Sequence, residues 1–512
     1  MINILYIGST SACFEWENDL PYYAEKEYDI FLNGKKAGSE KKNVFSLFDL
    51  VPDTEYSVKA GREEIRFRTK VEICAWNIRD FGAVGDGKTD DTESIETAIG
   101  RLPAGGRLFF PAGTYLSRPI SLKSHMTLEL CEGAVLLGST AKEDYPVIPA
   151  ETEDPVTKEM IPTGTWEGNA FPMYQSLVFA ENVCDIRIVG RGTVDGNAQN
   201  GTWWHNVKEY TVGRPRLLFF GMCDGVTVHG ITAQNAASWQ LHPFRSQNVG
   251  IYDIAVYAPK DSPNTDALDP ESCNGVDIVG CRFSVGDDCI AVKSGKIDMA
   301  KKYKMPAENH RIRNCLMQFG HGAVTLGSET ACGITGLTVT RCLFEHTDRG
   351  LRIKTRRGRG KDAVIDGVTF ENIKMDGVLT PIVINMWYNC CDPDRHSEYV
   401  WSREALPVDE RTPTLGKFVF RNMVCDGCHV AACYCDGLPE RPIEEITLEN
   451  IAFSYAENAV SGVPAMREFI EPMCRAGMIF DNVKSLSVRK VNVNGADGEA
   501  LTVRAVEKIV LE

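Results

Sequence analysis

The chain has 512 residues, and its 55 Lys and Arg against 70 Asp and Glu give a formal net charge of −15. Hydrophobic residues make up 43 % and charged residues 24 %, ordinary globular values that exclude a disordered chain, a collagen or a coiled coil. The acidic balance disfavours nucleic acid and membrane surfaces as partners because both are anionic, and no stretch approaches the roughly 20 apolar residues of a membrane helix.

The first residues, MINILYIGSTSACFEW, show no basic segment ahead of an apolar run, so we expect no signal peptide. The chain has 18 Cys, too dilute over its length for a small disulfide-held scaffold. Free thiols in this number favour a cytoplasmic protein. A secreted or periplasmic location is the alternative, if a leader has been removed.

Residues 1–72 predict a small β-sandwich, because short alternating runs are separated by turn signals such as Asn33-Gly34. Trp16, this turn and the phrase Leu50-Val-Pro-Asp-Thr-Glu-Tyr56 resemble a fibronectin type III module. A generic β cap on the following domain is the alternative. From Asn77 the chain becomes rich in Gly and Asp and enters a short predicted helix at 93–99, a phrase that resembles the opening of pectin-degrading β-helix enzymes.

The rest of the chain repeats a strand of alternating apolar residues with a small or polar interruption. Clear copies begin at Val226, Val249 and Val276, and looser copies continue to Val493. A basal period of about 23–28 residues with loop insertions is typical of a right-handed parallel β-helix, which we expect over residues 73–512. A leucine-rich repeat is excluded because the helical half of each repeat is missing.

Four polar phrases follow one another on neighbouring predicted coils: Asn264-Thr-Asp266, Gly286-Asp287-Asp288, Gly320-His321-Gly322 and Arg352-Ile-Lys354. Asp266 and Asp287 are 21 residues apart, about one coil, so their carboxylates can stack on one face. Gly286 allows a bulge that turns both following aspartates outward. Three carboxylates so close cannot all ionise cheaply, so at least one pKa should be raised, as general acid–base cleavage of a glycosidic bond requires. The alternative is that these phrases are structural turns.

These four phrases, in this order, resemble the signature of the polygalacturonases, glycoside hydrolase family 28, over residues 75–495. The resemblance implies an inverting hydrolase of α-1,4-galacturonosidic bonds in pectin, in which Asp287 is the general acid and Asp266 and Asp288 hold the attacking water. It further implies that His321 tunes the acid. Other residues are implied in substrate binding: Asn264, Arg352, Lys354 and, as the match to a functional tyrosine, Tyr388.

A basic run supports an acidic sugar independently, since residues 349–361 hold seven cations and no acid. Planar arginine side chains bind carboxylates through two parallel hydrogen bonds, so Arg356 and Arg357 join the predicted substrate-binding residues. The phrase that contains Trp239 and His242 resembles a site-lining phrase of bacterial members. We expect pectic poly- or oligosaccharide as the partner and neither a cofactor nor a metal; the oligomeric state is open.

Three long insertions distinguish this sequence from simple endo-acting members: 141–175, the loop after Lys293, and 389–417. With the N-terminal module they resemble bacterial exopolygalacturonases, so a galacturonan 1,4-α-galacturonidase is expected. The alternatives are a rhamnogalacturonan or xylogalacturonan hydrolase, a β-helical pectate lyase, and a non-catalytic sugar-binding β-helix. The cysteines of residues 425–435 could be zinc ligands, although Cys281, Cys315 and Cys342 recur as a small apolar column.

Overall fold

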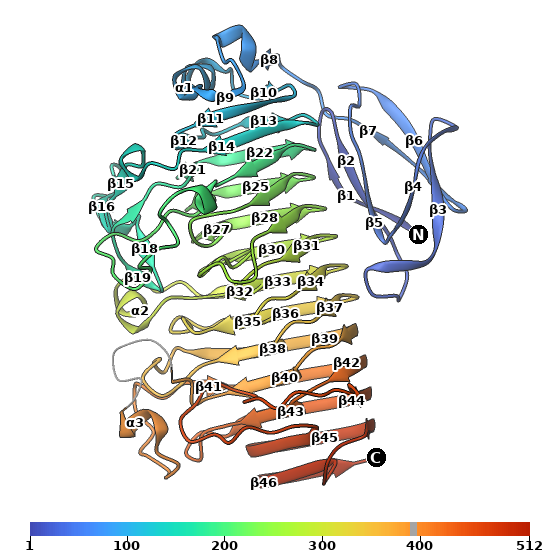
Figure 1. Ribbon diagram of the computed structural model, residues 1–512, viewed down its shortest axis with the longest axis vertical. Coiled ribbons are helices and arrows are strands. Elements are labelled where there is room, and N and C mark those ends of the chain that lie inside the picture. The colour runs from blue at the N-terminus through green and yellow to red at the C-terminus, as the bar shows by residue number, and fades with distance from the viewer. Residues whose placement is uncertain (390–396) are drawn as a thin grey trace.

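The computed structural model describes residues 1–389 and 397–512, and from Ala75 onwards the chain coils into a long parallel β-helix (Figure 1). Each coil contributes a strand to up to three columns, and equivalent strands of successive coils pair in parallel. The fold class predicted from the repeats is confirmed. No helix among the described residues is long and apolar enough to cross a membrane.

The first column carries the candidate site and consists of β12 (Ile120–Ser121), β21 (Val178–Glu181), β24 (Leu218–Gly221), β27 (Leu241–Phe244), β32 (Ile290–Val292), β35 (Val324–Gly327), β38 (Arg349–Lys354), β40 (Thr380–Asn385) and β43 (Ala431–Asp436). The second consists of β8 (Ala75–Asn77), β10 (Gly106–Phe110), β13 (Met126–Leu130), β22 (Cys184–Gly190), β25 (Asp224–His229), β28 (Gln247–Tyr252), β30 (Asn274–Val279), β33 (Ala307–Arg313) and β36 (Ile334–Thr340). The third consists of β9 (Asp86–Asp90), β11 (Gly113–Ser117), β14 (Ala134–Gly138), β23 (Thr193–Asp195), β26 (Thr232–Gln234), β29 (Ala255–Tyr257), β31 (Arg282–Ser284), β34 (Leu316–Gln318) and β37 (Leu343–Glu345). Long strands span two or three columns in the last coils: β39 (Val364–Asp376), β42 (Lys417–Cys428), β44 (Ile443–Tyr455), β45 (Ala476–Asn494) and β46 (Leu501–Leu511).

The core fills the inside of the coil because alternate side chains of each strand point inward. One inward row of the first column runs through fully buried residues that lie in register: Leu218, Leu241, Leu268, Ile290, Val324, Leu351 and Ile382. Helix α1 (Thr92–Arg101) covers the N-terminal end of this core with Ile95, Ala98 and Ile99.

The cysteine column predicted from the repeats lies in the same core, where Cys281, Cys315 and Cys342 are fully buried. The second cysteine group is buried there too, and the sulfurs of Cys433 and Cys435 lie 3.4 Å apart. Within the described residues, no third ligand-type side chain joins them closely enough to hold a metal ion. These thiols therefore act as apolar core side chains.

A corner of left-handed residues links the second column to the third. In register, coil after coil, a residue with positive φ occupies this corner: Gly190, Gly230, Asp253, Gly280, Asn314, Arg341, Asn372, Asn422, Asn450 and Lys490. Gly and Asn adopt this conformation at little steric cost. The corner therefore explains the recurrent Gly and Asn of the repeat.

Residues 1–68 form two antiparallel sheets beside the β-helix (Figure 1). One contains β1 (Ile2–Ile7), β2 (Ala12–Trp16) and β5 (Val44–Leu47), and the other β4 (Lys35–Lys42), β3 (Tyr23–Leu32), β6 (Glu55–Ala60) and β7 (Glu63–Arg68). Asn33 and Gly34 both have positive φ at the β3–β4 turn, as a two-residue hairpin requires. The fibronectin type III assignment and the boundary at residues 72 and 73 stay predictions.

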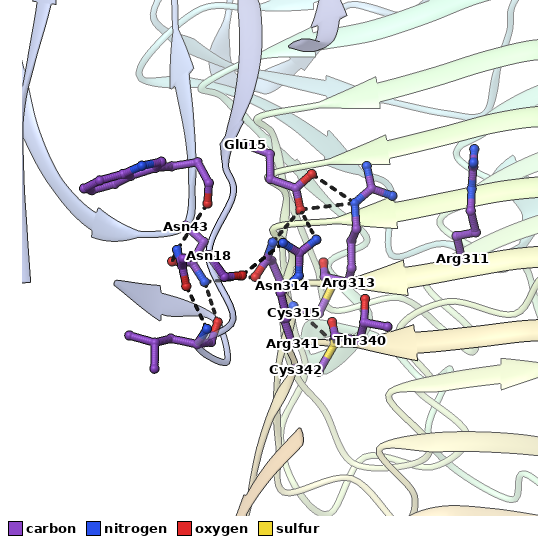
Figure 2. Close-up of polar contacts among 12 residues, drawn as sticks. Glu15, Asn18, Asn43, Arg311, Arg313, Asn314, Cys315, Thr340, Arg341 and Cys342 are labelled. Carbon is purple, nitrogen blue, oxygen red and sulfur yellow. Dashed lines mark hydrogen bonds and ion pairs between the residues drawn. The ribbon is translucent and has the colours of Figure 1, made fainter. Parts of the chain in front are cut away.

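The N-terminal sheets dock on the left-handed corner. Glu15 is 3 % exposed and accepts hydrogen bonds from Arg313, Asn314 and Arg341, three residues of two successive coils (Figure 2). At the neighbouring coils, a side chain at Gly280 would collide with Val44. Small residues at the corner therefore make room for the module.

Insertions project beyond the coil near the first column. Residues 141–175 form the hairpin pairs β15 (Val147–Ile148) with β20 (Met173–Tyr174), β16 (Glu151–Glu153) with β17 (Met160–Pro162), and β18 (Thr165–Trp166) with β19 (Asn169–Ala170). The loop after Lys293 contains α2 (Ile297–Tyr303). The insertion 389–417 contains α3 (Glu398–Trp401) and β41 (Thr414–Leu415) and lies partly outside the described residues. The first two insertions border the candidate site.

Candidate active site

A cavity of about 260 Å³ opens on the outer face of the first column and collects most of the predicted site residues. Its lining includes Asn264, Asp266, Asp287, His321, Arg352, Lys354, Trp239 and Tyr388. These residues come from coils that are adjacent in register, β27 through β40. Segments far apart in sequence therefore meet because the coils stack about 4.8 Å apart.

Asp266, Asp287 and Asp288 each place a carboxylate oxygen within 4.8 Å of the other two. Backbone hydrogen bonds align their coils, from Ala267 N to Asp288 O at 3.1 Å and from His321 N to Asp287 O at 3.2 Å. The side chain of Asp287 also accepts from the backbone N of Asp288 at 2.9 Å. At Gly286 a Cβ would lie 2.6 to 2.9 Å from three backbone carbonyls. Only glycine therefore fits immediately before the aspartate pair.

Asp288 is fully buried and held by two cations. Arg352 Nη1 lies 3.0 Å from one carboxylate oxygen, and Lys354 Nζ lies 2.7 Å from the other. Burial alone would raise the pKa of Asp288, but the charges of Lys354 and Arg352 outweigh it and hold this pKa well below its usual range. Asp288 is therefore ionised, and because both its oxygens already bind cations the three aspartates are poorly suited to hold a metal ion.

Asp266 has the opposite electrostatic environment. It is 4 % exposed, and burial raises its pKa well above the usual range, with the charges of Asp269 and Asp287 adding to the rise. The surroundings therefore raise the pKa of Asp266 and lower that of its neighbour Asp288. The sequence-based expectation that at least one of these carboxyl groups has a raised pKa agrees with this arrangement.

His321 borders the cavity, and its Nδ1 lies 2.8 Å from Asp348 Oδ2. This hydrogen bond raises the pKa of His321, and the charge of Asp287 adds to the effect although burial opposes it. The glycines on either side of His321 are required, because a Cβ at Gly320 would lie 2.6 Å from the Asp287 carbonyl and one at Gly322 would lie 2.9 Å from an Asp288 carboxylate oxygen.

Three predicted substrate-binding residues lie outside this cavity. His242 is fully buried beneath it, where its Nε2 lies 3.1 Å from Glu271 and its Nδ1 accepts from Arg216. Arg356 and Arg357 follow the end of β38 and border a separate cavity. Arg357 pairs with Glu440 through two hydrogen bonds of 2.6 and 2.8 Å.

The cavity also contains residues that the motifs did not identify as binding residues. Lys293 Nζ lies 4.6 Å from the Trp239 ring centroid and 3.3 Å from carboxylate oxygens of both Asp269 and Glu329. Burial would lower the pKa of Lys293, but the charges of Glu329 and Asp269 outweigh it and raise this pKa. Lys293 lies one coil before Gly327, in the same row as Lys354. This register could have placed Lys293 in the cavity from the sequence.

Loop residues complete the walls: Trp166 and Glu167 of the insertion 141–175, and Met466 of the loop between β44 and β45. Trp166 stacks on Trp239 with ring centroids 6.3 Å apart, and Arg216 lies over both rings. Met466 Sδ accepts from Arg352 at 3.1 Å. No motif signals these residues, because loops fold back on the coil through contacts that local sequence does not encode.

The site combines the ionised carboxylate of Asp288, the Asp266 carboxyl group with its raised pKa, and cations and aromatic rings that line one cavity. Neighbouring carboxyl groups of different protonation are the requirement for general acid–base catalysis. Aromatic faces suit the apolar face of a sugar ring, and the cations suit an acidic substituent. The arrangement can therefore hydrolyse a glycosidic bond of an acidic sugar.

Comparisons with known proteins agree with this chemistry. Residues 152–398 match the family described as glycosyl hydrolases family 28, and residues 75–213 match a family described as rhamnogalacturonase A/epimerase, pectate lyase-like. The chain is 33 % identical over 395 residues to a probable polygalacturonase of Vitis vinifera, covering 74 % of each chain. It is 27 % identical over 358 residues to an exo-poly-alpha-D-galacturonosidase of Dickeya chrysanthemi, covering 60 % of this chain and 56 % of that one.

Solved structures share the fold. A family 28 exopolygalacturonase of Yersinia enterocolitica superposes with a TM-score of 0.73 at 21 % identity, covering 100 % of this chain and 98 % of that chain. An exopolygalacturonase of Thermotoga maritima superposes with a TM-score of 0.63 at 24 % identity, covering 86 % and 91 %. The first match includes the N-terminal sheets, since it spans the whole chain.

Proposed function

This chain belongs to glycosyl hydrolase family 28, and we propose that it hydrolyses α-1,4-galacturonosidic bonds of polygalacturonate or oligogalacturonides from the chain end. The observation that carries the proposal is the pairing of Asp288, held by Arg352 and Lys354, with Asp266, whose pKa burial raises, and with the cavity-lining Asp287. Relatives named as polygalacturonase and as exo-poly-alpha-D-galacturonosidase support the substrate class.

We assign the proton donor to Asp287. Asp266 and Asp287 both line the cavity, and Asp287 is the more exposed of the two, so Asp287 is the better placed to reach the leaving oxygen of the substrate. Asp288, kept ionised, positions the attacking water and accepts its proton, with Asp266 as the second residue that holds the water. His321, whose pKa its hydrogen bond with Asp348 raises, orients the donor.

We propose inversion at the anomeric carbon, although the carboxylate oxygens lie within 4.8 Å of one another, closer than the roughly 6.5–9.5 Å common in inverting glycosidases. Asp288 supports inversion because Arg352 and Lys354 occupy both its oxygens, which makes it a poor covalent nucleophile. Proton NMR of the first product tests the assignment. Inversion of the α-linkage gives the β-anomer first, whereas initial α-anomer would establish retention.

Substrate binding follows from the remaining donors of the cavity. Arg352 and Lys354 each use one nitrogen on Asp288, and an ammonium has three donors, so Lys354 retains capacity for the galacturonate carboxylate. Tyr388, Trp239 and Asn264 surround the sugar. The loop residues Trp166 and Met466 close the cavity beyond it, which supports release of sugars from a chain end.

A leaving-group comparison tests the acid. Asp287→Asn should lower kcat on trigalacturonate by roughly 10²–10⁴-fold, the usual contribution of general acid catalysis, yet lose far less on a nitrophenyl galacturonide, whose leaving group needs no proton. Asp288→Asn should lose activity on both substrates. If Asp266→Asn instead loses activity on trigalacturonate and far less on the nitrophenyl galacturonide, Asp266 is the donor.

Product analysis tests the mode of action and the alternatives. We expect monogalacturonate as the first product of polygalacturonate, and an early ladder of oligomers would contradict exo action. Release of unsaturated, UV-absorbing ends would show a lyase instead, and activity on rhamnogalacturonan or xylogalacturonan alone would move the enzyme to those substrates.

We propose that residues 1–72 form a separate module that supports the catalytic domain of residues 73–512. Its contacts with the β-helix corner, rather than any contact with the cavity, support this role. A cytoplasmic location stays a prediction from the cysteines, sixteen of which are free thiols among the described residues.

A further inference from the structure

A second cavity of about 250 Å³ lies beyond the end of β38 and is lined by Asn169, Lys296, Ile297, Asp298, Arg356, Arg357, Gly358, Arg359, Tyr399 and Arg411. Five of these residues are cations and one is a carboxylate, Asp298. The side chain of Asp298 is 85 % exposed, so it neutralises little of the positive charge. Arg357 and Arg411 pair with Glu440 and Asp409, and Lys296, Arg356 and Arg359 give this hollow outside the catalytic site its remaining positive charge.

Arg359 is the residue that distinguishes this cavity from a solvated basic surface. It is 4 % exposed, and its Nε and Nη2 atoms are buried without a hydrogen-bond partner among the residues that the structure describes. A buried charged group with unsatisfied donors costs free energy, which an anion placed against it would offset. By contrast, Arg357 is satisfied by Glu440 and by the carbonyls of Tyr399 and Ser402.

Two further features suit an acidic sugar. Tyr399 presents a ring beside the cavity, with the Arg411 guanidinium 4.4 Å from its centroid. Arg411 pairs with Asp409 at the surface. Lys296 has a side chain 12 % exposed, and its closest carboxylate is Glu167 at 3.7 Å, a separation that leaves its ammonium donors available.

The second cavity adjoins the catalytic one. Both are lined by the same three segments: Glu167 and Asn169, Lys293 and Lys296, Lys354 and Arg356. Residues two or three apart on extended backbone lie within roughly 10 Å. Glu329 lines the catalytic cavity, where Lys293 Nζ lies 3.3 Å from its carboxylate. The charges of Lys293 and Lys296, with a smaller contribution from Arg359, hold the pKa of Glu329 below its usual range despite burial.

We propose that this second cavity binds the carboxylate of a uronate sugar, with Arg359 and Lys296 as its principal partners. The inference rests on the proposed function for the identity of the sugar. The uronate is either a further unit of the oligogalacturonide held in the catalytic cavity or a free galacturonate that binds separately.

Kinetics and calorimetry on full-length protein test the proposal with Arg359→Gln and Lys296→Gln, and Arg66→Gln on the exposed face of β7 as the matched control. If the chain continues into the cavity, both variants raise KM for tetragalacturonate about tenfold, the loss of one charge-assisted hydrogen bond, and leave digalacturonate unchanged. If the ligand is free, calorimetry with galacturonate loses one site in both variants while KM stays constant at every length. Galactose, which lacks the carboxylate, should bind in neither case.

Unchanged KM at every length together with an unchanged galacturonate titration would overturn the proposal. Thermal unfolding checks that the variants fold. If Arg359→Gln does not fold, Lys296→Gln alone tests the proposal. Failure of the proposed function can be distinguished from failure of the second-cavity proposal. It would appear as wild-type protein that releases no reducing ends, while the galacturonate titration would still report binding in the second cavity.

Discussion

Replacing Lys354 by methionine isolates the role of the ammonium, because Met keeps an unbranched apolar chain and removes only the charge and its donors. Lys354 Nζ lies 2.7 Å from Asp288, which is fully buried. Stripping a buried carboxylate of all partners costs about 3–5 kcal/mol, but Arg352 remains at 3.0 Å. We therefore expect Lys354→Met to destabilise the protein by about 2–3 kcal/mol at neutral pH, the range of a hydrogen bond to a charged group.

The sign of the pH dependence follows from the lowered pKa of Asp288. A carboxyl whose folded pKa lies below its unfolded value of about 3.9 stabilises the fold above that value, and the stabilisation is lost as pH falls through the folded pKa. Lys354 makes the largest contribution to the lowering, so the folded pKa of Asp288 rises in the variant. The difference in the free energy of unfolding between wild type and variant should be constant at neutral pH. It should become smaller once the pH falls below that raised pKa.

Thermal unfolding at a series of pH values between 4 and 8, paired with kcat on digalacturonate, measures both effects. The acidic limb of kcat should move to higher pH, because Asp288 must be ionised to accept a proton from water. Lys374→Met, an exposed cation on β39, controls for net charge. A difference in the free energy of unfolding below about 0.5 kcal/mol, or an acidic limb of the kcat–pH profile identical to that of wild type, would refute the reasoning that Lys354 keeps Asp288 ionised.

Two further predictions concern other contacts. Glu15→Ala leaves the arginines of the corner without their shared carboxylate and should release the N-terminal sheets. We expect faster proteolysis at residues 69–74 and a free energy of unfolding lower by about 3 kcal/mol, whereas Glu17→Ala, at an exposed position, should change neither. If the two variants behave alike, apolar packing alone holds the module. Asp348→Asn removes the hydrogen bond that raises the pKa of His321, so the alkaline limb of the kcat–pH profile should shift to lower pH. An unchanged alkaline limb would exclude His321 from the pH dependence.

The repeat made the fold and the aspartate cluster predictable from sequence. A coil of fixed length turns a spacing of 21 residues into a contact, so Asp266 could be placed beside Asp287 from numbering alone. Glycines around His321 were informative for the same reason, since close stacking leaves no space for a Cβ over Asp288.

The roles of the cations were not predictable. The run of residues 349–361 suggested one carboxylate-binding patch, but β38 ends at Lys354, and the chain then turns away, so Arg352 and Lys354 face Asp288 while Arg357 binds Glu440. Where a strand ends depends on the neighbouring coils rather than on local charge. His242 was misleading in a similar way, because its outward register is covered by Trp239 and Phe219.

The docking of the N-terminal sheets also sets an order for synthesis. Residues 6–49 supply the surface that meets the coils, but its partners extend to Arg341, so roughly 300 residues must be made before the contact is complete. At about 5–20 residues per second a ribosome needs roughly 15–60 s for that length. During this interval the buried face of Glu15, Cys13 and Val44 is uncovered, and the nascent chain exposes the Glu15 carboxylate without its partners until the growing β-helix covers it, one coil at a time.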